Sequence, residues 1–196
     1  MSNLATGLFG WDRTALAVEK VKDRLARASA ALSGAEVAYA VIGGNAVAEW
    51  VGRVDEAAVR TTQDVDLLIR RTDFEAAKAA LATAGFVHNR TLDVDMFLDG
   101  PNGRPKDAIH VVFAGEKVRA DYATPAPDVA DSEPAARFQV VSLESLVVMK
   151  LNSFRLKDRV HLMDLIGVGL VDRNWLTRVP VELTSRLQEL LDNPDG

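Results

Sequence analysis

Apolar residues in the N-terminal part of the chain recur at intervals of three and four positions. The residues that follow this spacing are Val18, Val21, Leu25, Ala28 and Leu32. Such a period places them on one face of a helix, so the pattern predicts an amphipathic helix with one buried side. Gly34 follows where the end of this helix is expected.

A different pattern, strict alternation, occupies residues 64–70. The sequence Asp64-Val-Asp-Leu-Leu-Ile-Arg70 places Val65, Leu67 and Ile69 on one face of a strand. Its other face carries Asp64, Asp66, Leu68 and Arg70. Residues 36–42 form a second β-prone run, which ends at Gly43-Gly44. We expect these two runs to be the central strands of a mixed sheet.

Further strands are expected at residues 92–98, 108–113 and 138–141. The first two are joined by the turn-rich segment 99–105. Short helices are expected at residues 45–51 and from Thr72, where Thr72 and Glu75 would form a capping box, to Gly85. Residues 52–62 and 121–136 are predicted to be loops.

The last third of the chain is predicted to be helical. Ser142 is placed to cap a strongly apolar helix, and residues 156–170 and 180–191 predict two more helices. The expected fold class is therefore α+β (α/β), a mixed β-sheet flanked by helices with a helical C-terminal third. We expect a single domain over residues 1–196, with a core at about 36–141 and C-terminal helices at about 142–193.

Composition narrows the possible functions. The chain has 196 residues, of which 48% are hydrophobic, enough for one domain with a full core. Its net charge of −5 argues against a nucleic-acid coat protein, although one local basic groove is still possible. Without cysteine it forms no disulfide and no zinc–thiolate site. Residues Met1–Trp11 show no secretory signal and no segment is apolar enough to span a membrane, so a cytoplasmic location is expected.

Asp64 and Asp66 are the first candidate functional residues. Two positions apart on a strand, they point to the same side with Cα atoms roughly 6.5–7 Å apart. Their negative charges would repel unless a divalent cation neutralised them, and oxygen ligands suit Mg²⁺ or Mn²⁺. The spacing alone is not specific, because Asp93-Val-Asp95 repeats it, and a solvated strand face is the alternative.

The context of this pair makes a functional site more plausible. Gly43-Gly44 lies between a strand and a short helix, where backbone N–H groups can bind an anion such as a triphosphate. Taken alone, it could be only a tight turn that requires glycine. The Gly-Gly turn and the segment Arg60-Thr-Thr-Gln-Asp-Val-Asp66 together would place a phosphate-binding backbone beside a metal-binding carboxylate pair. These two features are the minimum that phosphoryl or nucleotidyl transfer requires.

Lys150 is the third informative residue, because it lies within the apolar helix after Ser142. A buried ammonium group needs a partner, which could be a bound phosphate or a structural carboxylate. A third alternative is that the side chain extends to the surface. Arg155, Lys157 and Arg159 form a basic group close behind it, which could equally be a salt-bridged start of the next helix. His88 and His161 have no metal-ligand spacing and are predicted to be structural or exposed.

These segments together resemble the DNA-polymerase-β-like nucleotidyltransferase superfamily. The similarity is greatest to its toxin-type branch, the AbiEii-type nucleotidyltransferases of type IV toxin–antitoxin and abortive-infection systems. The residues that carry it are Val41-Ile-Gly-Gly-Asn-Ala46, Arg60-Thr-Thr-Gln-Asp-Val-Asp-Leu-Leu68, and Val148-Met-Lys-Leu151 followed by Arg155 and Lys157-Asp158. They span roughly residues 38–166. Their order and spacing are more specific for the fold than for the substrate.

The resemblance implies a metal-dependent transfer of a nucleotidyl group from a nucleoside triphosphate to an acceptor hydroxyl, on RNA or protein. It implies that Asp64 and Asp66 bind Mg²⁺ or Mn²⁺. It also implies nucleotide binding by Gly43, Gly44, Thr62, Lys150 and Arg155, and an antitoxin-like partner.

One position departs from the family pattern. Active members usually carry a third acid on a later strand, and Ala108-Ile-His-Val-Val-Phe113 places His110 there. A neutral histidine could accept a proton in place of that acid, but it is a poorer ligand than a carboxylate for Mg²⁺. Asp95 and Asp107 are the nearby alternatives. If the alignment is right, His110 lies beside Asp64 and Asp66 on the same sheet face.

Three functions are therefore compatible with the sequence. The first is an active nucleotidyltransferase, which the Asp64 and Asp66 pair favours. The second is a catalytically degenerate protein of the same fold that binds a nucleotide or a partner, which His110 favours. The third is a domain that acts through protein contacts alone, as one half of a toxin–antitoxin-like pair.

Overall fold

The computed structural model describes the backbone of residues 5–193 and the side chains of residues 15–193. The prediction about a secretory signal in Met1–Trp11 therefore lies outside the described side chains. Within residues 5–193, no helix combines the length and apolar character needed to cross a bilayer.

Seven strands form one mixed sheet in the order β3-β4-β5-β2-β1-β7-β6. The strands are β1 (Tyr39–Ile42), β2 (Val65–Ile69), β3 (Phe86–Thr91), β4 (Val94–Asp99), β5 (Ile109–Phe113), β6 (Ser132–Pro134) and β7 (Gln139–Val141). β2 runs parallel to β5 and β1 parallel to β7, and the other neighbouring pairs are antiparallel. β1 and β2 lie near the middle of the sheet, as predicted.

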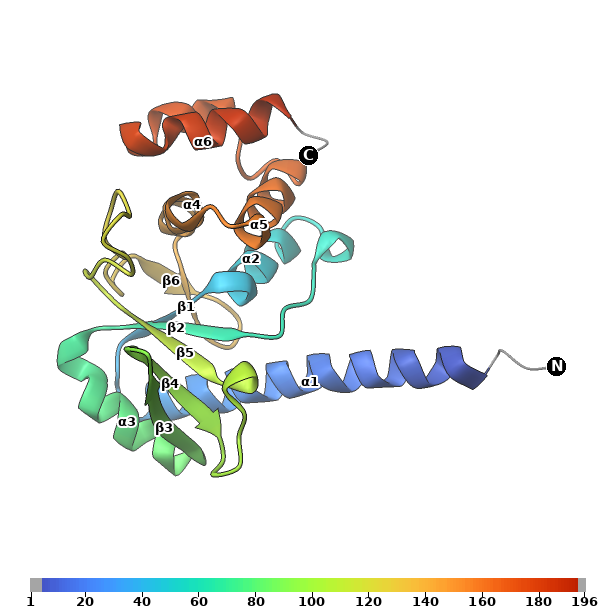
Figure 1. Ribbon diagram of the computed structural model, residues 1–196, viewed down its shortest axis with the longest axis vertical. Helices are drawn as coiled ribbons and strands as arrows, with labels where there is room; N and C mark the ends of the chain where they lie inside the picture. The colour runs from blue at the N-terminus through green and yellow to red at the C-terminus, as the bar shows by residue number, and fades with distance from the viewer. Residues whose placement is uncertain (1–4, 194–196) are drawn as a thin grey trace.

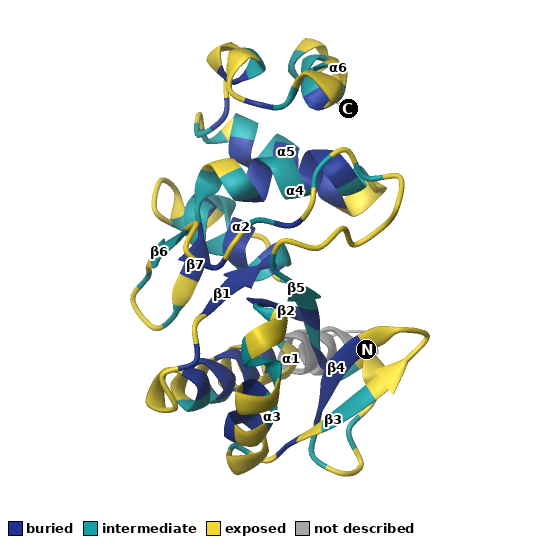
Figure 2. Ribbon diagram, turned by 90° about the vertical axis from the view of Figure 1, so that its left-hand side faces the viewer, coloured by how far each residue is buried: buried dark blue, intermediate teal, exposed yellow. Residues whose placement is uncertain are grey.

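Helices cover both faces of the sheet (Figures 1 and 2). They are α1 (Ala5–Gly34), α2 (Gly43–Gly52), α3 (Phe74–Thr83), α4 (Leu143–Ser153), α5 (Leu156–Gly167) and α6 (Val181–Asp192). α1 and α3 pack on one face, and the N-terminal part of α1 extends beyond the sheet (Figure 1). α2, α4, α5 and α6 lie on the other face.

The alternation in β2 explains this layering. Val65, Leu67 and Ile69 belong to the core under α1 and α3, whereas Leu68 belongs to the core under the other four helices. All four side chains are fully buried because each face of the strand has its own helical layer. Asp66 shares the face of Leu68, so it points toward the α2, α4 and α5 side.

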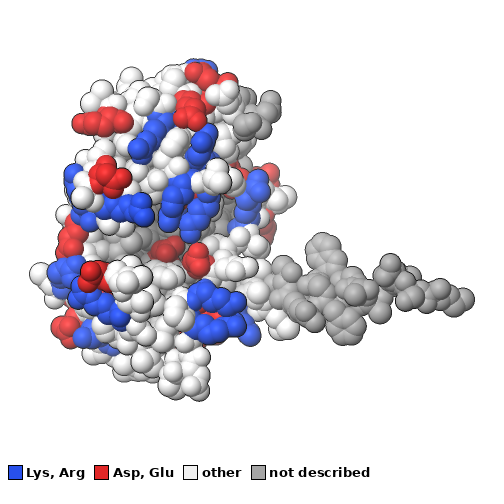
Figure 3. Space-filling view, viewed as in Figure 1, with Lys and Arg blue, Asp and Glu red and all other residues white. Residues whose placement is uncertain are grey.

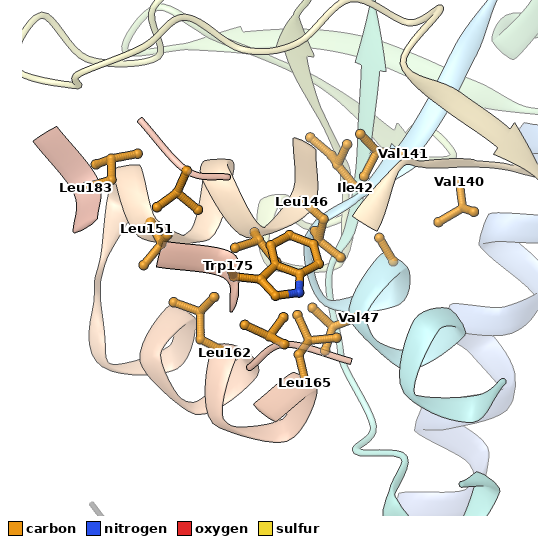
Figure 4. Packing of buried hydrophobic residues seen from close by; sticks show 14 of the residues in the cluster. Ile42, Val47, Val140, Val141, Leu146, Leu151, Leu162, Leu165, Trp175 and Leu183 are labelled. Carbon is orange, nitrogen blue, oxygen red and sulfur yellow. The ribbon is translucent and has the colours of Figure 1, made fainter. Parts of the chain in front are cut away.

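The C-terminal helices are held to the sheet by a second apolar core. Trp175, in the short helix η4 (Arg173–Thr177), lies among Leu146, Leu162, Leu165 and Val47 (Figure 4). This cluster joins α4 and α5 to α2, whose first residues follow β1 directly. The helical C-terminal third predicted from the sequence is thereby confirmed.

Strand β3 was not predicted from the sequence. Residues 86–91 have only two apolar side chains, and β3 is the edge strand of the sheet, so no regular alternation marks it. The strand expected at 92–98 begins at Val94, because Leu92 and Asp93 form the turn of the β3–β4 hairpin. β6 was likewise predicted to be part of a loop.

The prediction of a capping box at Thr72 is also wrong. α3 is preceded by the short helix η2 (Arg71–Asp73), and its N-cap residue Asp73 makes no side-chain cap. The Thr72 hydroxyl donates instead to the Asp73 carboxylate at 3.3 Å. The cap at Ser142 is confirmed, since its hydroxyl accepts a hydrogen bond from the backbone N–H of Ser145.

Candidate active site

The junction of β1 and α2 lies directly against the side chain of Asp66. Ile42 is opposite Asp66 in the antiparallel β1–β2 pair, and the next residue, Gly43, has a φ of +70°. A Cβ atom on Gly43 would be 2.0 Å from Oδ2 of Asp66. Only glycine permits both this backbone conformation and this approach, so the backbone at the start of α2 borders the carboxylate.

Two further contacts fix the segment before β2 to the first turn of α2. A Cβ atom on Gly44 would be 2.7 Å from the Thr62 hydroxyl oxygen, so Thr62 packs against the second glycine. The Asn45 side-chain N–H donates to the backbone carbonyl of Asp64 at 2.7 Å. Sequence reasoning did not select Asn45, although its place directly after Gly-Gly in a helix's first turn offered a signal.

His110 lies where the β2–β5 alignment predicts. β5 runs parallel to β2 with His110 opposite Asp66, and Nδ1 of His110 is 3.8 Å from Oδ1 of Asp66. Ile109 and Val111 are buried in the core under α1 and α3, as expected for the alternate positions. The predicted placement of His110 beside Asp66 is confirmed, whereas its position relative to Asp64 and its chemical role stay predictions.

The two alternative acids do not join this group. Asp95 is buried on the opposite face of the sheet, where its carboxylate lies 2.8 Å from Nε2 of His88. His88 is therefore structural, as predicted. Asp107 forms an ion pair with Arg104 in the β4–β5 connection.

The electrostatics of the site disfavour two unneutralised carboxylates. Burial raises the pKa of Asp66, and the charge of Asp64 acts in the same direction. The positive charges of Lys150 and Lys157, and that of His110 when protonated, oppose the rise. The Lys157 ammonium group is 3.5 Å from Oδ2 of Asp64, so a side-chain cation already lies at the pair.

Lys150 is paired with a structural carboxylate. It is buried in α4, and its ammonium group donates to Oδ1 of Asp158 at 3.0 Å. Asp158 also accepts from Arg155 Nε and from the Ser153 hydroxyl, each at 2.7 Å. Of the three alternatives for Lys150, extension into solvent is therefore wrong. Contact with a bound phosphate stays a prediction.

This buried cluster has shifted pKa values. Burial opposes ionisation of Asp158, but the hydrogen bonds from Arg155 and Ser153 and the charge of Lys150 outweigh it and lower its pKa to about 2. Burial lowers the pKa of Lys150, against the attraction of Asp158 and Asp66. Burial and the charge of Lys150 lower the pKa of His161 to about 4, so this histidine is neutral at pH 7. The mutual influence of Lys150 and Asp66 links the cluster to the aspartate pair.

Asp64 and Asp66 offer oxygen ligands of the kind that Mg²⁺ takes, and a metal site there stays a prediction. The charge of Asp64 acts on Asp66, and the Lys157 ammonium group lies beside Asp64. Within residues 15–193, no group of three or more acidic or histidine side chains is arranged to hold a metal. Two carboxylates nevertheless suffice for Mg²⁺, which commonly completes its shell with water and substrate phosphates. Figure 3 shows acidic side chains in a hollow of this face, with basic side chains gathered on both sides.

Comparisons with solved structures identify the architecture. The antibiotic-resistance factor ANT(2″)-Ia has a TM-score of 0.54 and 15% identity, with 87% of this chain and 90% of that chain aligned. JHP933 from Helicobacter pylori has a TM-score of 0.50 and 12% identity over 91% of this chain and 75% of that one. An H. pylori protein described as a nucleotidyltransferase has a TM-score of 0.50, with 12% identity over 89% of this chain and 76% of that one. The chain has the nucleotidyltransferase fold.

Sequence comparison adds no closer relationship. No protein-family model matches the chain, and no curated protein is a significant sequence match. The nucleotidyltransferase fold brings the predicted site residues into two groups. Gly43, Gly44, Thr62, Asp64, Asp66 and His110 surround the end of β1, and Lys150 and Arg155 belong to the cluster on α4 and α5.

Replacing Gly43 by alanine should be costly for two separate reasons. An alanine at a φ of +70° is strained by roughly 1–2 kcal/mol, and its Cβ also collides with Asp66. Gly85→Ala is the matched control, because Gly85 has a φ of +84° but open space around it. Urea denaturation should show a larger loss of stability for Gly43→Ala than for Gly85→Ala. Equal losses would mean that the carboxylate moves aside freely.

Asp158→Asn should destabilise the protein by about 3–5 kcal/mol at neutral pH, because Lys150 is left buried without its counter-charge. Asp128→Asn is the control, since Asp128 also has a pKa of about 2 but forms an exposed pair with Arg70. That substitution should cost less than about 1 kcal/mol. Urea denaturation of both variants measures the difference.

The same pair gives a pH signature. Because the folded pKa of Asp158 is depressed, its contribution is present above pH 4 and is lost as the pH falls toward 2. The wild type should lose about 2 kcal/mol more than Asp158→Asn over that interval. Parallel stability curves would contradict the role of this buried pair.

Proposed function

We propose that the protein is a metal-dependent nucleotidyltransferase that transfers a nucleotidyl group from a nucleoside triphosphate to an acceptor hydroxyl. The approach of the Gly43 backbone to Asp66, with Asp64 and His110 beside it, carries this proposal. It brings an anion-binding backbone and a carboxylate pair to one point. Nucleotidyl transfer requires both, because a polyanionic substrate must be held beside carboxylates that would otherwise repel it.

The binding roles follow from position. The N–H groups at the start of α2, next to Gly43 and Gly44, bind the triphosphate, and Thr62 holds the neighbouring loop against Gly44. Lys150 and Arg155 add positive charge from α4 and α5. Because Asp158 holds both of them, they contribute mainly a fixed field and need not release their partner.

The reaction proceeds by in-line displacement. The acceptor oxygen forms a bond to the α-phosphorus, and the bond between that phosphorus and pyrophosphate breaks. His110 accepts the proton of the attacking hydroxyl, and Asn45 keeps Asp64 in position through its backbone. A Mg²⁺ or Mn²⁺ ion bound by Asp64 and Asp66 would supply neutralisation of the phosphate charge.

The acceptor is proposed to be RNA or a protein. The proposal of a macromolecular acceptor, and of an antitoxin-like partner, rests on the resemblance of the three sequence motifs to toxin-type nucleotidyltransferases. A cytoplasmic location would suit an RNA acceptor and a protein acceptor alike.

A second function is favoured by one observation. His110 occupies the register opposite Asp66, where a third acid would complete the metal ligands. A protein with this site could bind a nucleoside triphosphate without turning it over. Pyrophosphate release separates the two functions, since only the enzyme produces it.

Nucleotide binding should depend on the aspartate pair. After a thermal-shift screen of the four nucleoside triphosphates with Mg²⁺ or Mn²⁺, calorimetry on the best ligand should show a loss of about tenfold or more for Asp64→Asn and for Asp66→Asn. Glu75→Gln, an exposed change on α3 on the other face, should leave the affinity unaltered. Metal-independent binding, or full affinity in both aspartate variants, would refute the proposed site.

His110→Asp should strengthen Mg²⁺-dependent nucleotide binding, because it adds an oxygen ligand opposite Asp66. His110→Asn is the matched control, with similar size but no negative charge, and should not reproduce the gain. If His110 serves as the base, pyrophosphate release by His110→Asn should fall while nucleotide affinity is retained. Unchanged metal affinity in His110→Asp would show that this position does not reach the ion.

A further inference from the structure

The two edges of the sheet are protected very differently. β6 has three residues and ends in Pro134, and its Glu133 pairs with Arg53 of the α2 C-cap. β3, at the other edge, has six residues and no proline, and none of the described strands pairs with its outer side. A long unprotected edge presents backbone N–H and C=O groups that can pair with another strand.

The turn next to this edge contains a strained and exposed leucine. Leu92 is 94% exposed, and both Leu92 and Asp93 have positive φ, at 49° and 62°. A two-residue hairpin turn of this kind normally uses asparagine, aspartate and glycine, because other residues are strained there. Figure 2 shows the exposed end of the hairpin standing clear of the rest of the molecule. Leu92 belongs to none of the apolar cores of the described residues.

A groove at the start of the same strand complements this leucine. It has a volume of about 460 Å³ and lies between α3 and β3, lined by Lys78, Ala82, Gly85, Phe86, Val87 and His88. Its walls are therefore apolar apart from one ammonium group and one imidazole. An apolar side chain followed by an acidic one would fit them.

We propose that this edge binds a second copy of the chain, with β3 pairing antiparallel to β3 of the second copy about a twofold axis at Asn89. Counting outward from the axis, Val87 then lies opposite Thr91, the last residue of β3. The turn residue Leu92 follows Thr91 and so comes next to Phe86 of the second copy. The exposed Leu92 of each copy thus reaches the groove of the other at Phe86. The twofold axis makes this contact occur twice.

The face and the charges agree with this register. Residues 86, 88 and 90 alternate onto one face of β3, and the Phe86 side is the face that α3 covers. Leu92 follows in the turn, directly after the last residue of the strand. A twofold axis perpendicular to the sheet keeps that face on the same side in both copies. Asp93, in the turn, then comes to the side on which Lys78 of the second copy lies. Within one copy Asp93 pairs with Arg90 and Lys78 with Glu75, so this contact would add to existing ion pairs.

The less favourable pair is His88 opposite Arg90. Each of these residues has a carboxylate partner within its own copy, Asp95 for His88 and Asp93 for Arg90, so no unneutralised like charges meet. The inference is independent of the proposed function, because no residue of the nucleotide site takes part. Failure of either proposal leaves the other intact.

Residue 89 provides the decisive experiment, because it is its own partner only in this register. Sedimentation velocity should show the wild type at twice its 21.3 kDa chain mass. Asn89→Lys and Asn89→Asp should each weaken dimerisation by about tenfold or more, since like charges then face each other on the axis. Mixing the two variants should restore the dimer. Val118→Lys, an exposed change elsewhere, is the control.

Leu92→Gly separates the interface from the fold. Glycine relieves the positive φ, so the melting temperature of this variant should equal or exceed that of the wild type while the dimer is lost. Because the chain has no cysteine, Asn89→Cys supplies a single thiol that should cross-link two copies on oxidation. Thr91→Cys should not, since residue 91 is four positions from its counterpart across the axis.

Three results would overturn the proposal. They are a monomeric wild type at high protein concentration, a dimer that survives both Asn89→Lys and Leu92→Gly, and a mixture of the two charged variants that stays monomeric. If the wild type is monomeric, the outer side of β3 is instead available to pair with an extended segment of a different protein.

Discussion

The close approach of the Gly43 backbone to the Asp66 carboxylate is the constraint on which the site depends. It requires a glycine at positive φ, and it places the backbone at the start of α2 against one side of the half-buried carboxylate. The neighbouring contacts serve the same geometry. Thr62 packs on Gly44 and Asn45 holds the backbone of Asp64, so the segment before β2 cannot move away from α2.

Charge is distributed around this point in two layers. The inner layer is the aspartate pair with His110 and Lys157 close by, and it is partly open to solvent. The outer layer is the buried cluster of Lys150, Asp158, Arg155 and Ser153 on α4 and α5. The outer cluster satisfies its own hydrogen bonds and still influences Asp66 through the charge of Lys150. The C-terminal helices therefore contribute to the site as well as to the core.

Sequence reasoning succeeded where a local rule governs the structure. Alternation in residues 64–70 placed Asp66 on the correct face, and the same rule applied to residues 108–113 placed His110 opposite it. It failed where a contact between segments distant in the sequence determines the structure. The choice of Asp158 as the partner of Lys150 depends on how α4 and α5 cross, which no spacing reveals. β3 escaped detection because an edge strand with few apolar residues resembles a loop.

Burial of β2 on both faces has an evolutionary consequence. Side chains on a strand alternate, so inserting or deleting one residue between Thr62 and Asp66 would exchange the positions of Asp66 and Val65. The carboxylate would then enter the apolar core under α1 and α3, and a valine would face the Gly43 turn. Residues 53–57, which are exposed and precede the Thr62 contact, carry no such register. We therefore expect a one-residue insertion on that side of Thr62 to be tolerated better than one between Thr62 and Asp66.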